Sequence, residues 1–169
     1  MNFRIDWSGR AIDYTNDELK TIIDVAKTAD PLTQGKYLAR FEEKIKDYLG
    51  VDNAFGLTSA ASALELIAVL SGVGPGDEVI IPSHTYCASA IPFGRTGAKI
   101  VWADINPSTF VISPEDIQRK ITKKTKLVVV VHLYGLMCDM AQIVEICKDN
   151  NLILVEDCAQ AFGAEYNHK

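Results

Sequence analysis

The sequence is 169 residues long and has none of the features that mark membrane or secreted proteins. No apolar run approaches the roughly 20 residues of a membrane-spanning helix, and the region after Met1 lacks the apolar core of a signal peptide. The four cysteines include no C-x-x-C pair, and His84 with Cys87 forms an isolated H-x-x-C motif. Because no second ligand pair accompanies that motif, we expect no metal site. We expect a cytoplasmic protein that binds no membrane.

Signatures of nucleic-acid binding and of common nucleotide cofactors are absent as well. The chain carries 17 Lys and Arg against 22 Asp and Glu, and no basic stripe offsets the net charge of −5, which argues against a nucleic-acid partner. Neither G-x-G-x-x-G nor G-x-x-x-x-G-K-[ST] occurs, which excludes the dinucleotide and P-loop signatures. The 48% apolar and 23% charged content is ordinary for a globular protein, and the length predicts one domain over residues 1–169.

What the chain does contain is a regular alternation of apolar runs and helical patterns. Two amphipathic helices come first, and the second ends at Gly50. This order predicts an α/β fold, a mostly parallel sheet with helices on both faces; a flavodoxin-like fold is an alternative that the two leading helices argue against. The helix at 60–70 and the strand at 152–155 are apolar enough that we expect both to be buried on most sides. Strands are predicted at 54–57, 78–81, 99–103, 127–131 and 152–155, and helices at 60–70, from about 86, from 114 and from 140.

Three turns that follow predicted strands carry side chains suited to a ligand site. In the segment Thr58–Ser62, the N–H groups that begin a helix could bind a phosphate, or Ser59 could simply cap the helix. Tyr86 could lay its ring over a flat ligand, or it could be a core tyrosine with its hydroxyl satisfied. His132 could polarise a ligand or act as a structural hydrogen-bond partner.

The strongest single signal is the pair Glu156-Asp157 at the end of the last predicted strand. Because burying an unpaired charge is costly, the pair fits the carboxyl end of a parallel strand, where open α/β sheets place their ligands. Asp157 could keep a ring nitrogen protonated, or it could serve only in a cap or turn. Gln160 falls on the same side as Asp157 if the turn is helical. A phosphate cradle, an aromatic lid and an acid together predict a phosphorylated, nitrogen-containing aromatic cofactor, which pyridoxal 5′-phosphate (PLP) fits.

Six motifs follow one another along nearly the whole chain. They are LTQG at 32–35, FEE at 41–43 with YLG at 48–50, GPGDEVI at 74–80, PSHTY at 82–86, HLYG at 132–135 and EDCAQAFGA at 156–164. In combination they resemble the N-terminal part of the DegT family of PLP-dependent sugar aminotransferases, which has the aspartate-aminotransferase-like type I fold. The resemblance implies the large domain of a PLP-dependent transferase, incomplete in this chain.

The same resemblance implies roles for individual residues in cofactor binding. Tyr86 takes the place of the aromatic residue that stacks on the cofactor ring, Asp157 that of the acid paired with the pyridine nitrogen, and Gln160 that of the glutamine on the cofactor hydroxyl. Ala60 and Ala61 fall where the family holds the phosphate, often with a threonine. Because Ala61 has no hydroxyl, backbone N–H groups helped by Ser59 or Ser62 would have to serve. Phe162 stands where many relatives have histidine.

The activity implied for the parent protein is transfer of an amino group from a donor such as glutamate to a nucleotide-linked keto-sugar. Such enzymes serve amino-sugar or cell-surface polysaccharide biosynthesis, here as a homodimer. The family's Schiff-base lysine lies beyond the motif at 156–164, and Lys169 comes too early, so we expect no catalytic residue in this chain. We expect the N-terminal portion of the large cofactor-binding domain without the small C-terminal domain, with an exposed sheet edge and no activity alone. Alternatives are a related PLP-dependent sugar dehydratase, with histidine in place of the lysine, and a truncated non-catalytic remnant.

Overall fold

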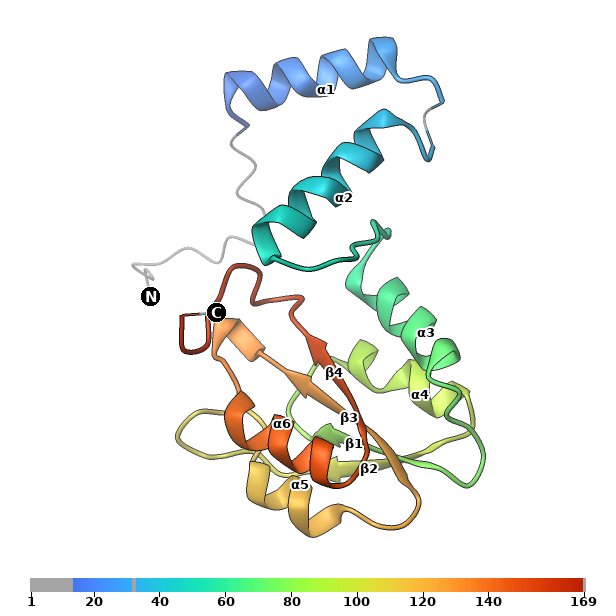
Figure 1. Ribbon diagram of the computed structural model, residues 1–169, viewed down its shortest axis with the longest axis vertical. Coiled ribbons are helices and arrows are strands. Elements are labelled where there is room, and N and C mark those ends of the chain that lie inside the picture. Colours follow the sequence, from blue (N-terminus) through green and yellow to red (C-terminus); the bar gives the residue numbers. More distant parts are fainter. Residues whose placement is uncertain (1–13, 32, 169) are drawn as a thin grey trace, which may run out of the picture. The chain divides into compact units, whose positions relative to one another are not determined.

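The computed structural model describes residues 14–31 and 33–168, and these form two compact units that divide between Gly56 and Leu57. The described part of the first unit contains helices α1 (Asn16–Thr28) and α2 (Lys36–Leu49) (Figure 1). Thr15 caps α1 in a capping box with Glu18, and α2 ends at Gly50, whose φ of 65° suits a residue without a Cβ. Both leading helices are therefore confirmed.

The second unit is built on a parallel four-stranded sheet with the strand order β2-β1-β3-β4. The strands are β1 (Glu78–Pro82), β2 (Lys99–Ala103), β3 (Thr125–Val131) and β4 (Ile153–Asp157). The α-helices are α3 (Ala60–Leu70), α4 (Ile91–Arg95), α5 (Pro114–Lys120) and α6 (Met140–Asp149), with single 3₁₀ turns η1 (Cys87–Ser89) and η2 (Leu133–Gly135). The α/β fold predicted from the sequence is confirmed.

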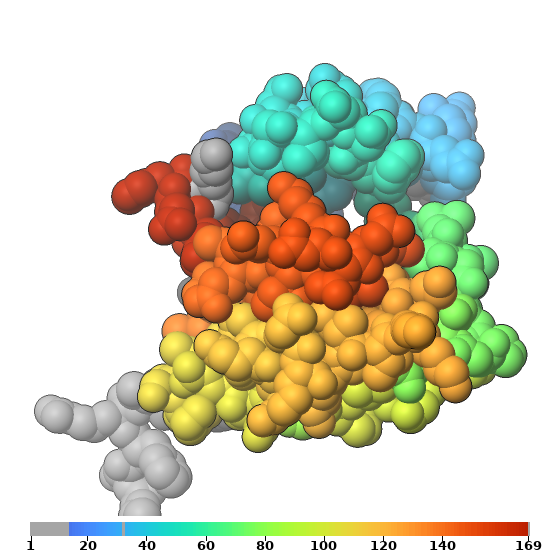
Figure 2. Space-filling model, turned by 60° about the horizontal axis from the view of Figure 1, so that its bottom comes forward, coloured from blue at the N-terminus to red at the C-terminus, as the bar shows by residue number. Residues whose placement is uncertain are grey.

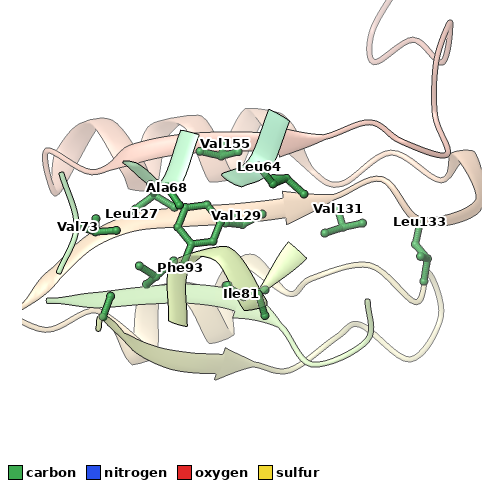
Figure 3. Packing of buried hydrophobic residues seen from close by; sticks show 13 residues of the cluster. Leu64, Ala68, Val73, Ile81, Phe93, Leu127, Val129, Val131, Leu133 and Val155 are labelled. Carbon is green, nitrogen blue, oxygen red and sulfur yellow. The ribbon is translucent and has the colours of Figure 1, made fainter. Parts of the chain in front are cut away.

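Successive side chains of the central strands point to opposite faces of the sheet, and each face is covered by two helices (Figure 1). Figure 3 shows Ala68 of α3 and Phe93 of α4 packed over Leu127 and Val129 of β3. The intervening residues of β1 and β3 pack against α5 and α6, which lie side by side in Figure 2. Continuous Val and Ile runs therefore form strands because both of their faces are buried. No helix of the described residues is long and apolar enough to cross a membrane.

Two expectations about burial were wrong, and one about the sheet edge was met. Helix α3 is not buried on most sides: Leu64 and Ala68 are buried, but Val69 and Leu70 are exposed, because one face of the helix packs on the sheet. The last strand, β4, pairs with β3 on one side within the described chain, so Ile153 is exposed rather than buried. Its outer edge matches the exposed edge that we expected.

Two segments take a different form from the one predicted. Residues 54–57 are not a strand, because no described strand pairs with them to satisfy their backbone groups. The helix expected from about Tyr86 is divided into η1 and α4, which meet at Ala90 just before Pro92. Proline has no backbone N–H, so Pro92 fits the first turn of α4 but could not donate a hydrogen bond within a helix continuing from η1. The helices expected from 114 and from 140 are confirmed as α5 and α6, whose N-caps are Ser113 and Asp139.

Candidate functional site

A cavity of about 270 Å³ lies at the edge of the sheet where β1, β3 and β4 end. Its walls are mostly apolar, and Leu64, Val131 and Leu133 from this region appear together near the end of β3 in Figure 3. All five residues predicted to bind a cofactor line it: Ala60, Ala61, Tyr86, Asp157 and Gln160. The structure thus gathers into one cavity residues that are up to 100 positions apart, and it adds Ser59, Thr85, Ala88, Ser89 and Ala159 to the lining.

Asp157 reaches this cavity because it is the last residue of β4 and points to the same face as Val155. Its carboxylate is buried, since the residue is 9% exposed, and it accepts two hydrogen bonds. The Ser89 hydroxyl donates to Oδ2 at 2.8 Å, and the Ala159 N–H donates to Oδ1 at 3.1 Å. The second bond is an Asx turn, so the turn role considered for Asp157 is real and coexists with its place in the cavity.

The start of α3 forms another wall of the cavity. Ser59 is the N-cap, and its Oγ accepts the Ser62 N–H at 3.1 Å, so the capping role is confirmed. The first N–H groups of an α-helix have no partner within the helix, and this applies to Ala60 and Ala61, which both line the cavity. Small methyl side chains at both positions let an anion approach these donors.

Tyr86 and Gln160 are two exposed residues of the cavity lining. The Tyr86 side chain is 70% exposed, so the alternative of a core tyrosine is wrong. Gln160 lies in a turn after β4, and its Oε1 accepts the N–H of Tyr134 at 2.9 Å. Tyr134 has a φ of 56°, in the left-handed region, and this bond ties its loop to the cavity wall. With its oxygen engaged, Gln160 has its amide NH₂ group to offer to a ligand.

His132 has a structural role rather than a place in the cavity. It is fully buried, and its Nδ1 accepts the backbone N–H of Cys138 at 3.1 Å. Because a backbone N–H can only donate, the ring proton sits on Nε2, which donates to Glu156 at 3.1 Å. His132, Glu156 and Cys158 hold potential metal-ligand atoms within 4.8 Å of one another, but a protonated Nε2 has no lone pair for a metal ion.

The isolated H-x-x-C motif does not assemble a ligand set in the described part of the chain. His84 Nδ1 lies 3.3 Å from the carbonyl oxygen of Phe110, and Cys87 is an exposed free thiol. Burial raises the pKa of another thiol, Cys138, to about 11, which keeps it protonated at neutral pH. Cys138 therefore behaves as a small core residue.

Ser89 is the polar residue of the cavity that sequence reasoning missed. It is 1% exposed and lies 68 residues before Asp157, its hydrogen-bond partner. A single serine in a run of small residues gives no sequence signal of that contact. The available clue was its place three residues after Tyr86, at the end of the helical turn that follows β1.

Comparison with known proteins identifies a family. Residues 13–169 match the model of the DegT/DnrJ/EryC1/StrS aminotransferase family. The chain is 43% identical over 137 residues, 81% of its length, to GDP-perosamine synthase of Escherichia coli O157:H7. It is 46% identical over 129 residues, 76% of its length, to dTDP-3-amino-3,6-dideoxy-alpha-D-galactopyranose transaminase of Aneurinibacillus thermoaerophilus.

A solved structure shares the fold as well. The crystal structure of NtdA from Bacillus subtilis with bound cofactor PMP matches 88% of this chain with a TM-score of 0.81 and 35% identity. The matched part is 35% of the NtdA chain, and the present chain likewise spans 38% and 36% of the two curated relatives. The similarity therefore covers most of this chain and a little over a third of each relative.

Proposed function

This chain belongs to the DegT/DnrJ/EryC1/StrS aminotransferase family, and we propose that the full-length protein is a PLP-dependent aminotransferase acting on a nucleotide-linked keto-sugar. The named relatives support the substrate class, since they are GDP-perosamine synthase and a dTDP-sugar transaminase. The observation that carries the proposal is the placement of Asp157 in one cavity with Tyr86, Gln160 and the start of α3. These are the groups that a phosphorylated pyridine requires.

The residues of the cavity fit PLP by their chemistry. Its mostly apolar walls suit a flat ring, and the exposed ring of Tyr86 is available to cover one face of it. The Asp157 carboxylate is the one acidic group among the described lining residues, and it accepts hydrogen bonds without donating any. The N-terminus of α3, an 11-residue helix, offers N–H groups and a favourable dipole to a phosphate.

Each of these groups has a defined task in the proposed enzyme. Asp157 holds a proton on the pyridine nitrogen, because a neighbouring anion favours the protonated form of the ring. The NH₂ group of Gln160 donates to the ring hydroxyl, and the N–H groups of Ala60 and Ala61 bind the phosphate. When bound, PLP would carry the amino group between donor and acceptor, and its protonated ring would act as the electron sink.

The remaining features of the proposed protein concern its whole length. We assign residues 1–169 to the N-terminal portion of the large cofactor-binding domain, with the Schiff-base lysine and the small domain in the rest of the protein. Coverage of little more than a third of each relative supports this assignment. We further propose that the protein is a cytoplasmic homodimer that uses an amino donor such as glutamate.

The test is a product analysis with the full-length protein. The protein is loaded with PLP and incubated with glutamate and a GDP- or dTDP-linked keto-sugar, and the nucleotide sugars are identified by mass spectrometry. We expect an amino-sugar nucleotide to form together with 2-oxoglutarate. A sugar that has lost a hydroxyl without gaining nitrogen would instead identify the related dehydratase, and an unchanged substrate in every combination would refute the proposal.

A further inference from the structure

We propose that Ser89 is a positioning residue that orients the Asp157 carboxylate toward the cofactor ring, an inference that rests on the proposed function. Ser89 Oγ lies 2.8 Å from Asp157 Oδ2 and 2.9 Å from Thr85 Oγ1. Ser89 and Thr85 both line the cavity, but the tasks described above use neither of them. A buried hydroxyl between two polar groups at this point needs a physical explanation.

The direction of these hydrogen bonds follows from the number of protons. An ionised carboxylate has no proton to give, so the single hydroxyl proton of Ser89 must go to Asp157. Ser89 Oγ can then only accept from its other neighbour, and Thr85 must be the donor in their contact. The chain of donors therefore runs in one direction, from Thr85 through Ser89 to Asp157, and each bond supports the next.

This arrangement fixes the orientation of the Asp157 carboxylate and leaves some of its hydrogen-bond acceptor sites free. A carboxylate has about four acceptor sites, and Ser89 and the Ala159 N–H occupy one on each oxygen. The remaining sites are available to the N–H of a protonated pyridine. Apolar neighbours such as Val131 and Leu133 cannot hold a carboxylate in one rotamer, whereas a donor on Oδ2 can.

The position of Ser89 in the chain links the acid to the aromatic residue. Ser89 ends η1, and its backbone N–H donates to the carbonyl oxygen of Tyr86 at 3.0 Å. One tight turn thus carries the ring proposed to cover the cofactor and the hydroxyl that fixes the acid on β4. Ser89 is 1% exposed, so water has little access to replace the hydroxyl.

The test is a double-mutant cycle on the affinity of the full-length apoprotein for PLP, measured by equilibrium titration. Because hydrogen bonds to charged groups are the stronger kind, we expect Ser89→Ala to weaken binding about tenfold to a hundredfold. Ser89→Thr keeps the hydroxyl and should restore affinity to within a few-fold of the wild type. In an Asp157→Asn background, Ser89→Ala should add less than about a twofold loss, because its partner charge is gone.

Two further variants separate positioning from a general effect on the fold. Ser113→Ala removes the N-cap of α5 on the other side of the sheet, so it should destabilise the protein without changing PLP affinity. If Ser89→Ala does not fold, Thr85→Val replaces it in the cycle, and a loss of about threefold or more that disappears in the Asp157→Asn background is expected.

The possible results lead to distinct conclusions. Wild-type affinity in Ser89→Ala would overturn the positioning role while leaving the proposed function intact. The same conclusion would follow if Ser89→Ala caused equal losses with the natural aspartate and in the Asp157→Asn background. If the wild-type protein itself takes up no PLP, the proposed function fails and this inference fails with it.

Discussion

At the scale of single residues, the cavity combines a few polar groups with walls that offer no competing interactions. Asp157 is fixed by Ser89 and Ala159, and Gln160 is fixed by the N–H of Tyr134. These contacts orient the carboxylate and the amide before any ligand arrives, and they leave acceptor sites on the carboxylate and the amide NH₂ group available. Preorganisation of this kind lowers the cost of ordering side chains on binding.

The start of α3 offers a residue-scale prediction. Ala61 lacks the hydroxyl that the family resemblance leads us to expect, so Ala61→Thr in the full-length protein should add one hydrogen bond to the phosphate of PLP. We expect PLP affinity to increase about twofold to tenfold, the equivalent of one ordinary hydrogen bond. Ala63→Thr, on the same helix but outside the cavity lining, is the matched control. Equal affinities of the Ala61→Thr variant and the wild type would contradict the phosphate assignment.

Site residues could be predicted from the sequence where they directly follow apolar strands. Asp157 and Tyr86 follow predicted strands closely, and the parallel order of those strands brings their ends together. Ser89 could not be predicted, because its role depends on a contact across 68 residues that no local pattern encodes. His132 had two interpretations that differ only in the direction of its side chain, which the sequence does not determine.

At the scale of elements, the packing of α4 on the sheet supports the site, because α4 directly follows η1. Phe93 on α4 is fully buried against the sheet, so Phe93→Ala should lower the free energy of unfolding by about 3–5 kcal/mol. Phe110→Ala, at a half-exposed position, should cost far less. Urea denaturation of the full-length variants measures both free energies of unfolding. A loss in Phe93→Ala as small as that in Phe110→Ala would show that α4 contributes little to the core.

The first residue of β1 gives a prediction about pH. The hydroxyl of Thr122 and then Lys99 Nζ donate to Glu78, and they lower the pKa of its carboxyl below the ordinary value of 4.5. A pKa that is lower in the folded state stabilises the protein above pH 4.5, and this contribution is lost as the pH falls through the folded value.

Glu78→Gln should therefore reduce stability at neutral pH and make it depend less on pH below 4.5. Denaturation midpoints measured from neutral pH to about 3 test this expectation, with the exposed Glu145→Gln as control. An acid limb that is as steep in Glu78→Gln as in the wild type would show that Glu78 does not contribute to it.

The predicted elements that the structure confirms are those whose local sequence signals agree with their tertiary surroundings. Capping residues fixed the start of α1, α5 and α6, and Gly50 fixed the end of α2. The burial of an element was harder to predict, because it depends on which other elements pack against it. Helix α3 and strand β4 are both apolar, yet each is covered on one side within the described chain. Residues 54–57 have a strand-like composition but no described strand beside them.

At the scale of the whole molecule, many large apolar side chains of the described residues are exposed. No described residue of α1 or α2 is buried, although both helices carry apolar side chains such as Ile22, Ile23 and Phe41. Val69 and Leu70 of α3 and the outer edge of β4 are exposed in the second unit. We therefore expect these side chains to contact further protein, as in the homodimer proposed above.

The proposed homodimer leads to a prediction about association. We expect the full-length protein to sediment as a dimer, because burial of apolar surface of this kind drives subunit association. The 169-residue chain expressed alone should instead form larger, heterogeneous species through its uncovered surfaces. Analytical ultracentrifugation compares the two, and a sharp monomer peak from either protein would contradict the expectation for it.

The most direct measurement for the account as a whole is the uptake of PLP by the full-length apoprotein and by its Asp157→Asn variant. Asparagine keeps the shape of the side chain but removes the charge that holds a proton on the pyridine nitrogen. We predict that the wild type binds PLP and that Asp157→Asn binds it about tenfold to a hundredfold more weakly. Equal binding by the two proteins would contradict the central claim that Asp157 is the partner of the cofactor ring.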